Sequence, residues 1–241
     1  MRIMSFVDTV RRAAFEIAVI TCALLACGMA QTVRPVVVEY RATAKGKFEL
    51  VNDGLEPLTV ILQPVSFVIN EDGDPTFGKL NPAIHLKLSA MSLRIPPLQK
   101  RFVFYEASAD ALPAWFTIYS TISGHQQSRG FNIEIDLPHT VYLSQKERLE
   151  KSDVEVESAR YIESTHRVAI SVINTSAKLG RVLGWEISAK GKKVDSSGFP
   201  LLPGSRRRLE IAWESPNVPD KLSLQFDHFA IKHEISLQRK N

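Results

Sequence analysis

The only group of potential metal ligands in the sequence lies near its C-terminus. Asp227, His228, His233 and Glu234 carry the carboxylate and imidazole groups that bind zinc. On one strand the two histidines would face opposite sides, because side chains alternate with a period of two. A hairpin at Ala230 could bring them together, but a zinc site usually needs a third ligand nearby. We therefore predict surface histidines on a C-terminal hairpin, no metal site and no cofactor.

Two other pairs of carboxylates invite a chemical interpretation. Asp72 and Asp74 flank Gly73 as in the start of a calcium loop, but the bidentate glutamate that should follow is missing, so a β-turn is expected. Glu134 and Asp136 are two residues apart and would lie on one face of a strand. A solvated strand edge explains them without catalysis.

The remaining composition argues against an enzyme and against nucleic acid as a partner. No serine lies in a G-x-S-x-G motif, and the glycine patterns of phosphate-binding and dinucleotide-binding loops are absent. The formal net charge of +4 is small for 241 residues. The basic cluster Arg206, Arg207 and Arg208 is interpreted as a solvated turn. We expect no catalytic residue, and a hydrolase has no motif in its favour.

The first thirty residues have the layout of a secretory signal peptide. Three arginines precede an apolar segment from Ile17 to Met29, and small residues follow. This segment is shorter than the about 20 residues that a helix needs to cross a bilayer, so export with cleavage after Ala30 is predicted. The alternative is an uncleaved anchor that starts near Ala13.

Both cysteines lie within this segment, so the cleaved chain would hold no thiol and no disulfide. The run Leu24 to Cys27 also resembles the lipobox of bacterial lipoproteins. If that alternative holds, Cys27 is the lipidated first residue, and only then is a membrane expected as a partner.

Beyond Ala30 the apolar residues recur mainly with a period of two, which predicts strands separated by Gly, Pro, Asn and Asp turns. Seven strands at this spacing are typical of an antiparallel sandwich. The expected strands are Val33 to Tyr40, Lys47 to Asn52, Leu58 to Asn70, His85 to Leu88, Arg101 to Glu106, Trp115 to Ser123 and Phe131 to Leu137.

A second series of strands follows a polar segment that has the only helical pattern of the chain, Ser144 to Lys151. This segment is expected to be a linker. The strands predicted after it are Val154 to Glu163, Arg167 to Asn174, Arg181 to Ala189, Lys192 to Asp195, Arg207 to Trp213, Leu222 to Phe229 and Ile231 to Leu237.

The two halves resemble each other. KFELVNDGLEPLTVIL (47–62) parallels RVAISVINTSAKLGRVLGWEI (167–187), each a strand that ends in Asn, then a turn and an apolar strand. IPPLQKRFVFYE (95–106) parallels LLPGSRRRLEIAWE (201–214) in the same way. Such internal similarity indicates tandem sandwiches. We predict an all-β chain of two tandem immunoglobulin-like sandwiches, with a signal peptide at 1–30, a first domain at 31–143, a linker at 144–152 and a second domain at 153–241.

The first half also resembles the N-terminal domain of the periplasmic pilus-assembly chaperones, the PapD-like family. The resemblance covers residues 33–143, and its features occur in the family's order. They are a Pro-containing first strand (Pro35), a strand ending in Asn before a Glu-Pro turn (Asn52, Glu56, Pro57), a proline turn before an alternating strand (Pro96, Pro97) and a late strand after Leu-Pro (Leu112, Pro113).

This resemblance implies donor-strand complementation, in which the last strand of the first domain lends apolar side chains to a partner with an incomplete sandwich. The residues in that position are Phe131, Ile133, Ile135 and Leu137, with a continuation past Pro138 to Val141 and Leu143. The alternative is that these four side chains face their own core.

The family also holds a terminal carboxylate of its partner with two basic residues, and here the sequence departs from the family. Val36, Val37 and Val38 follow Pro35 where the family places its arginine. The nearest basic residues are Arg34, which would point to the other face, and Arg129, which precedes the alternating run.

The resemblance therefore implies a non-enzymatic chaperone of the periplasm. Its partners would be exported pilin-like subunits or other envelope subunits, and an outer-membrane usher is a further candidate. The alternative is a structural or adhesive envelope protein that keeps the fold without chaperone activity.

Overall fold

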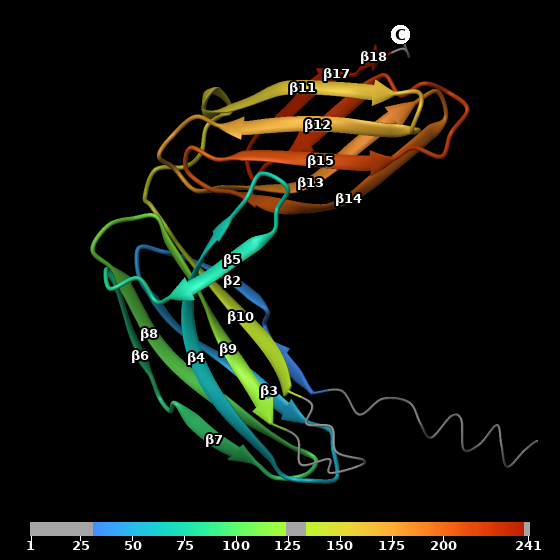
Figure 1. The fold of residues 1–241 in the computed structure, drawn as a ribbon. Helices are drawn as coiled ribbons and strands as arrows, with labels where there is room; N and C mark the ends of the chain where they lie inside the picture. Colours follow the sequence, from blue (N-terminus) through green and yellow to red (C-terminus); the bar gives the residue numbers. More distant parts are fainter. Residues whose placement is uncertain (1–30, 124–133, 239–241) are drawn as a thin grey trace, which may run out of the picture.

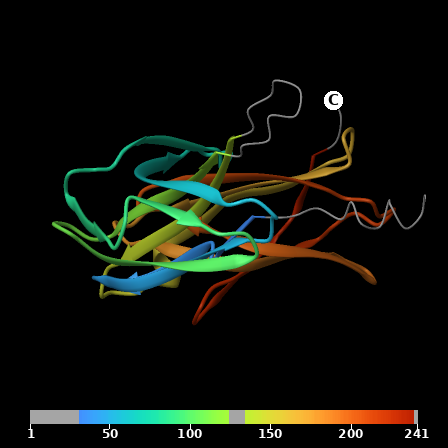
Figure 2. The same ribbon diagram turned by 90° about the horizontal axis from the view of Figure 1, so that it is seen from below.

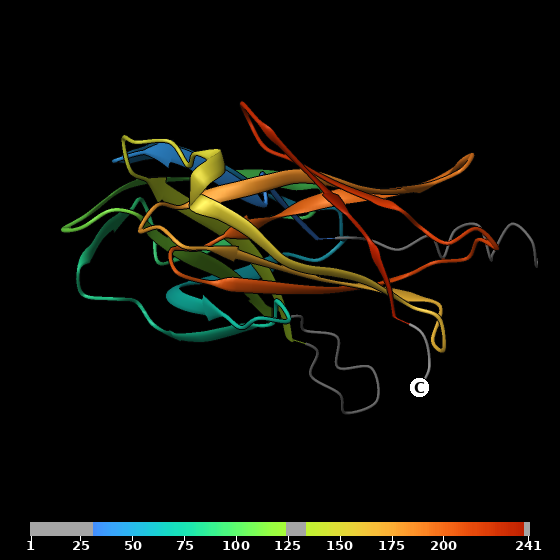
Figure 3. The ribbon, with the colours of Figure 1, turned by 90° about the horizontal axis from the view of Figure 1, so that it is seen from above.

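A computed structural model describes residues 31–123 and 134–238, which are almost entirely β-structure. Figure 1 shows two sandwiches that meet at an angle, one built from β1–β10 and the other from β11–β18. The first sandwich lies nearer the viewer in Figure 2 and the second in Figure 3. The described residues contain no helix long and apolar enough to span a membrane.

The first sandwich consists of two sheets with the strand orders β1-β3-β8-β6 and β2-β10-β9-β4-β5, and β7 pairs with β4. Its strands are β1 (Thr32–Arg34), β2 (Val37–Arg41), β3 (Ala44–Asn52), β4 (Leu58–Ile69), β5 (Pro75–Lys79), β6 (Ile84–Leu88), β7 (Ser92–Ile95), β8 (Gln99–Ala109), β9 (Ala114–Ser123) and β10 (Glu134–Ser144).

The second sandwich has the orders β15-β12-β11-β18 and β14-β13-β16-β17. A 3₁₀ turn, η1 (Lys151–Asp153), precedes it. Its strands are β11 (Val154–Ile162), β12 (Arg167–Asn174), β13 (Gly180–Ala189), β14 (Lys192–Leu201), β15 (Arg206–Ala212), β16 (Lys221–Gln225), β17 (Ala230–Glu234) and β18 (Ser236–Gln238). The all-β prediction of two immunoglobulin-like sandwiches is confirmed.

Alternating side chains from the facing sheets form a separate core in each sandwich. The first core includes Phe48, Val60, Phe116 and Val141, and the second includes Trp213. Each of these side chains is at most 1% exposed. Two separate cores explain why period-two patterning occurs twice along the chain.

The expected strand Val33 to Tyr40 is in fact two strands in different sheets. β1 pairs antiparallel with β3, whereas β2 pairs parallel with β10. Pro35 lies between them and has no N–H to donate to a ladder, so the chain changes sheet there. Two short strands, β5 and β7, were not predicted, because every residue of β5 is exposed and β7 has only four residues.

The two Asn-containing turns are equivalent in three dimensions as well as in sequence. Asn52 is fully buried, and its Nδ2 donates to the carbonyls of Glu56, Ile95 and Pro96 at 2.8, 3.1 and 3.0 Å. Its Oδ1 accepts the N–H of Gly54 at 2.9 Å. One side chain thus holds two loops together.

In the second sandwich the same role falls to Asn174, which is also fully buried. Its Nδ2 donates to the carbonyls of Lys178, Leu201 and Leu202, and its Oδ1 accepts the N–H of Ser176. The similarity of the two halves inferred from the sequence therefore corresponds to the same buried Asn arrangement in each sandwich.

Candidate functional site

The N-terminal half of β10 has one open edge. β10 pairs with β9 from Glu134 to Leu143, which is all of β10 except its last residue. On its other side β2 pairs only with Thr140 to Ser144. Within the described ranges, the backbone from Glu134 to Pro138 therefore pairs with no second strand. An edge of this kind is a template for pairing with another chain.

The apolar side chains of β10 become more exposed toward this open end. Val141 and Leu143 are fully buried in the first core, and Leu137 packs against it while half-buried. Ile135 is 36% exposed. Leu137 thus contributes to its own core, as the alternative interpretation holds, whereas Ile135 is accessible. Phe131 and Ile133 lie outside the described residues.

β10 also continues beyond the predicted end at Leu137 and runs through Pro138 to Ser144. Pro138 is tolerated because it lies in the half of β10 that has an open edge, where a missing N–H breaks no ladder. The strand therefore continues past Pro138, but Val141 and Leu143 are buried in the first core, and their part in donation stays a prediction.

A buried histidine marks the point where β2 takes over the edge of β10. His139 Nδ1 lies 2.6 Å from the carbonyl oxygen of Pro35, and Nε2 lies 3.0 Å from the hydroxyl of Tyr105. Because a carbonyl only accepts, Nδ1 carries the proton. The ring stacks on Phe48 at 4.6 Å, and the Tyr105 hydroxyl is also hydrogen-bonded to that of Tyr40.

These hydrogen bonds hold the backbone at Pro35, where the chain changes sheet, in place beside β10 and β8. Tyr40 and Tyr105 fit because Gly46 lies directly beneath their rings, where a Cβ atom would collide with both. Burial lowers the pKa of His139, and the hydrogen bond to Pro35 opposes this only in part. The imidazole is therefore held neutral.

We expect the stability of the protein to fall as the pH drops below 6.5, partly because of His139. The unfolded chain binds a proton near pH 6.5 and the folded chain only at lower pH, so acid favours unfolding by up to about 1.4 kcal/mol per pH unit. Urea titrations at pH 7 and pH 5 should show a loss about 1–2 kcal/mol larger for the natural protein than for His139→Gln. Equal losses in both proteins would show that His139 does not couple to folding.

The other end of β10, which β2 covers, reaches a cleft where the two sandwiches meet. A cavity of about 350 Å³ is lined there by Glu39 and Arg41 of β2, by the segment after β10 and by the start of β13. Arg181 of β13 forms an ion pair with Glu39, and its guanidinium lies 5.2 Å from the ring centroid of Tyr142. Arg181 is thus already paired, whereas Arg41 forms no ion pair with the described residues.

Of the two predicted carboxylate anchors, the described residues include only Arg34. Arg34 ends β1 in register with Glu49, in the sheet that does not contain β10, and its side chain is exposed. It does not line the cavity. Arg129 lies outside the described residues. Their role in holding a carboxylate remains a prediction.

An apolar contact joins the sandwiches beside this ion pair. Phe67, Tyr142, Leu179 and Leu202 form a third buried cluster, with Trp115 packed against it. The indole of Trp115 donates to the carbonyl of Phe67 at 2.8 Å. These side chains come from β4, β9 and β10 on one side and from the loops before β13 and after β14 on the other.

The loop between β4 and β5 makes a second, polar contact with β15. Glu71 forms ion pairs with Arg206 and Arg208, and its backbone carbonyl accepts the N–H of Arg208. Arg206 also binds Glu157, and this bond, together with one from Ser171, lowers the pKa of Glu157 to about 2. The loop is visible in Figure 1, where the turn between β4 and β5 reaches the second sandwich.

The interpretation of Arg206 to Arg208 as a solvated turn is therefore wrong. Arg206 begins β15, and Arg207 packs against Gly73 with its guanidinium over the Phe199 ring. Burial lowers the pKa of Arg207. The sequence did not reveal this role because the partners, in the 70–74 loop, are about 135 residues away.

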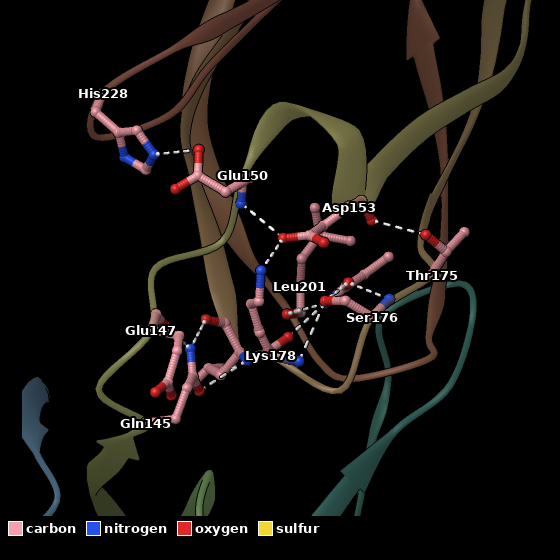
Figure 4. A network of polar contacts seen from close by, with 11 residues as sticks. Gln145, Glu147, Glu150, Asp153, Thr175, Ser176, Lys178, Leu201 and His228 are labelled. Atoms are coloured by element: carbon pink, nitrogen blue, oxygen red, sulfur yellow. Dashed lines mark hydrogen bonds and ion pairs between the residues drawn. The ribbon is translucent and has the colours of Figure 1, made fainter.

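The segment that connects β10 to β11 has no regular secondary structure apart from the short turn η1. The helical pattern of Ser144 to Lys151 is overridden by contacts with the second sandwich, which Figure 4 shows. The Gln145 side chain donates to the carbonyl of Leu179 and accepts its N–H. Asp153 accepts from Lys178 at 2.7 Å and from the N–H of Glu150.

The other candidates of the sequence carry no site. The described residues contain no group of three or more side chains that could hold a metal ion. His228 lies 3.5 Å from Glu150, while His233 is placed in β17. Glu134 and Asp136 are exposed, and Asp136 accepts a hydrogen bond from Thr121.

The residues that sequence reasoning missed are His139, Glu39 and Arg181. His139 gave a usable signal, because it falls on the core-facing parity of β10 between Leu137 and Val141. The pair of Glu39 and Arg181 gave none, since it joins elements 142 residues apart.

Comparison with known proteins places this architecture among the fimbrial chaperones. No protein-family model matches the sequence, and no curated protein matches it. The class 5 fimbriae chaperone CfaA has a similar structure, with a TM-score of 0.53, 6% identity, and 86% of this chain and 99% of that chain covered.

Two further structures agree. The Salmonella enterica SafA pilin in complex with the SafB chaperone gives a TM-score of 0.53 at 10% identity, with 86% and 97% covered. The YadV chaperone gives 0.52 at 12%, with 86% and 98% covered. The chain therefore has the two-sandwich fold of the fimbrial chaperones.

Proposed function

We propose that the protein is an exported, non-enzymatic chaperone that binds envelope subunits by lending them the free half of β10. The domains would be residues 31–143 and 153–241, joined by the linker 144–152 and preceded by a cleaved signal peptide. The observation that carries the proposal is the open backbone edge from Glu134 to Pro138. The similarity of the fold to the solved structures of CfaA and of the SafB chaperone with its pilin supports the proposal.

The binding step needs no bond to be made or broken. A partner strand would pair with the N–H and C=O groups of Glu134 to Pro138, while Ile135 enters the partner's unfilled groove. Phe131 and Ile133 would extend this row of side chains. Leu137 already touches the first core and would mark the inner end of the shared region.

The cleft would bind the terminal carboxylate of a partner, if at all, through other basic residues than those the family uses. Arg181 is engaged by Glu39, and Arg206 and Arg208 are engaged by Glu71. Arg41 and Lys146 also line the cavity and form no ion pair with the described residues, so a terminal carboxylate would meet these cations and not the positions that the family uses. The second candidate is a structural or adhesive envelope protein that keeps the fold without chaperone activity, and the departure from the family's anchor positions favours it.

Co-purification tests the chaperone proposal. The chain is co-expressed with the small exported proteins that neighbouring reading frames encode, and complexes are isolated from the periplasm. We expect one of them to co-purify, and Ile135→Asp to lower the yield of complex at least tenfold, because a carboxylate in an apolar groove costs several kcal/mol. Ile61→Asp is the matched control, since Ile61 is exposed by 52% on β4.

The outcomes separate the two candidates. Loss of the complex in Ile135→Asp, with unchanged thermal stability, supports donation by β10. A chain that is always isolated alone, or a complex that Ile61→Asp weakens equally, favours the structural or adhesive protein. Unfolding of Ile135→Asp would assign Ile135 to the protein's own core and overturn the proposal.

A further inference from the structure

The outer face of the sheet β1-β3-β8-β6 combines exposed phenylalanines with lysines. On β8 the inward residues Val103 and Tyr105 are buried, so the residues between them point outward. The outward side chains of β3, β6 and β8 define a face that we call the lysine–phenylalanine face. Its lysines and phenylalanines are Lys45, Lys47, Lys87, Lys100, Phe102 and Phe104, and the acids Glu49 and Glu106 lie on the same face.

The two phenylalanines are exposed to solvent and are not part of the first core. Phe102 is 43% exposed and Phe104 is 56% exposed, although the first core is completed by other residues. Adjacent exposed aromatic side chains often mark an interaction site. A groove of about 430 Å³ runs beside Phe104 and is bounded by Lys47 and Lys87.

The charge of this face is positive. Lys100 pairs with Glu49 at 2.9 Å and Lys45 pairs with Glu106 at 3.1 Å. Lys47 and Lys87 form no ion pair within the described part of the chain, and the Lys47 amine lies 4.7 Å from the centroid of the Phe102 ring. Arg34 adds a further exposed cation next to Glu49.

We propose that the lysine–phenylalanine face docks on an anionic lipid surface. Lysine is depleted from the centres of protein–protein interfaces, which argues against a protein as the occupant. At a membrane, lysine stems lie along apolar groups while the amines reach lipid phosphates, and the phenyl rings enter the acyl boundary. Anionic headgroups attract each nearby lysine.

This contact would not depend on lipidation of Cys27 and would not interfere with the proposed function. β10 and the cleft residues Glu39 and Arg41 of β2 belong to the opposite sheet of the first sandwich, so a membrane-bound molecule keeps the open edge accessible. The inference also stands if the protein has no chaperone activity.

Vesicle co-sedimentation tests the inference. The full exported chain is mixed with vesicles of phosphatidylcholine alone or of phosphatidylcholine with phosphatidylglycerol. We expect binding to the anionic vesicles only, and its loss when the ionic strength rises from about 0.05 to 0.5 M. The double variant Lys47→Glu with Lys87→Glu should weaken binding by about 25-fold or more, since each lysine near the surface contributes about fivefold.

A second pair of variants tests the aromatic part. Phe102→Thr with Phe104→Thr should weaken binding at least fivefold without lowering the melting temperature, because threonine suits an exposed strand. Lys190→Glu with Lys192→Glu is the charge-matched control on the second sandwich, where both lysines are exposed. All variants share one N-terminus, so any lipid affinity of the first thirty residues is common to them.

Three results would overturn the proposal. They are no binding of the natural protein to the anionic vesicles, an equal loss in the Lys190 and Lys192 control, and binding of a poly-glutamate peptide to this face without vesicle binding. The last would identify an acidic protein as the occupant. Loss of subunit co-purification with vesicle binding intact would concern only the chaperone function.

Discussion

Replacing Asn52 with alanine is expected to lower the free energy of unfolding of the first sandwich by about 3–4 kcal/mol. The side chain is fully buried and makes four hydrogen bonds. Its loss leaves the carbonyls of Ile95 and Pro96 without their donor, and each buried unpaired group costs about 1–3 kcal/mol. Urea unfolding with hydrogen exchange, which assigns the loss to one sandwich, measures the effect.

Asn70→Ala is the matched control for this variant. Asn70 also accepts two backbone N–H groups in a turn, at 2.8 Å each, but it does so at the exposed surface. Water replaces the lost partner there, so we expect a cost under about 1 kcal/mol. Asn174→Ala should reproduce the large effect in the second sandwich. A small loss in both buried variants would show that the loops are held by other contacts.

The equivalence of Asn52 and Asn174 also explains which part of the fold could be predicted from the sequence. A strand that ends in Asn before a turn is a local pattern, and period-two alternation is local too, so both are visible in one chain. The turn works only because Asn reaches carbonyls 27 to 44 residues away. The later Pro-containing turns mark those distant partners in the sequence.

The features that escaped prediction depend on how separate elements meet. To predict the change of sheet at Pro35, one would have to know that β2 pairs with β10. The helical pattern of Ser144 to Lys151 fails because Gln145 is bound by Leu179 across the junction. Local propensity contributes only tenths of a kcal/mol per residue and yields to such contacts.

The sequence predicted the strand that forms the candidate site but not which part of its edge is uncovered. Alternation identified the apolar row that includes Ile135 and Leu137. It could not show that β2 covers only the half of β10 beyond His139, because the length of that pairing is set by the sheet change at Pro35. The open edge is therefore a consequence of tertiary structure.

The second large effect is expected from Leu179→Asp, which should uncouple the two sandwiches. Leu179 is 8% exposed and packs in the cluster with Phe67, Tyr142 and Leu202 between them. A carboxylate in this apolar contact costs several kcal/mol, and the molecule avoids that cost by separating the sandwiches. We expect the docked state to lose about 3 kcal/mol or more, which is a factor of over 100 in population.

Calorimetry and small-angle scattering measure this uncoupling. The natural protein should unfold in one transition if the junction couples the two cores, and Leu179→Asp should unfold in two, with a larger radius of gyration before heating. Leu183→Asp is the control, because Leu183 lies on β13 near the junction but is 52% exposed. A single transition and an unchanged radius in Leu179→Asp would mean that the ion pairs of Glu71 and Glu39 hold the sandwiches together without the apolar cluster.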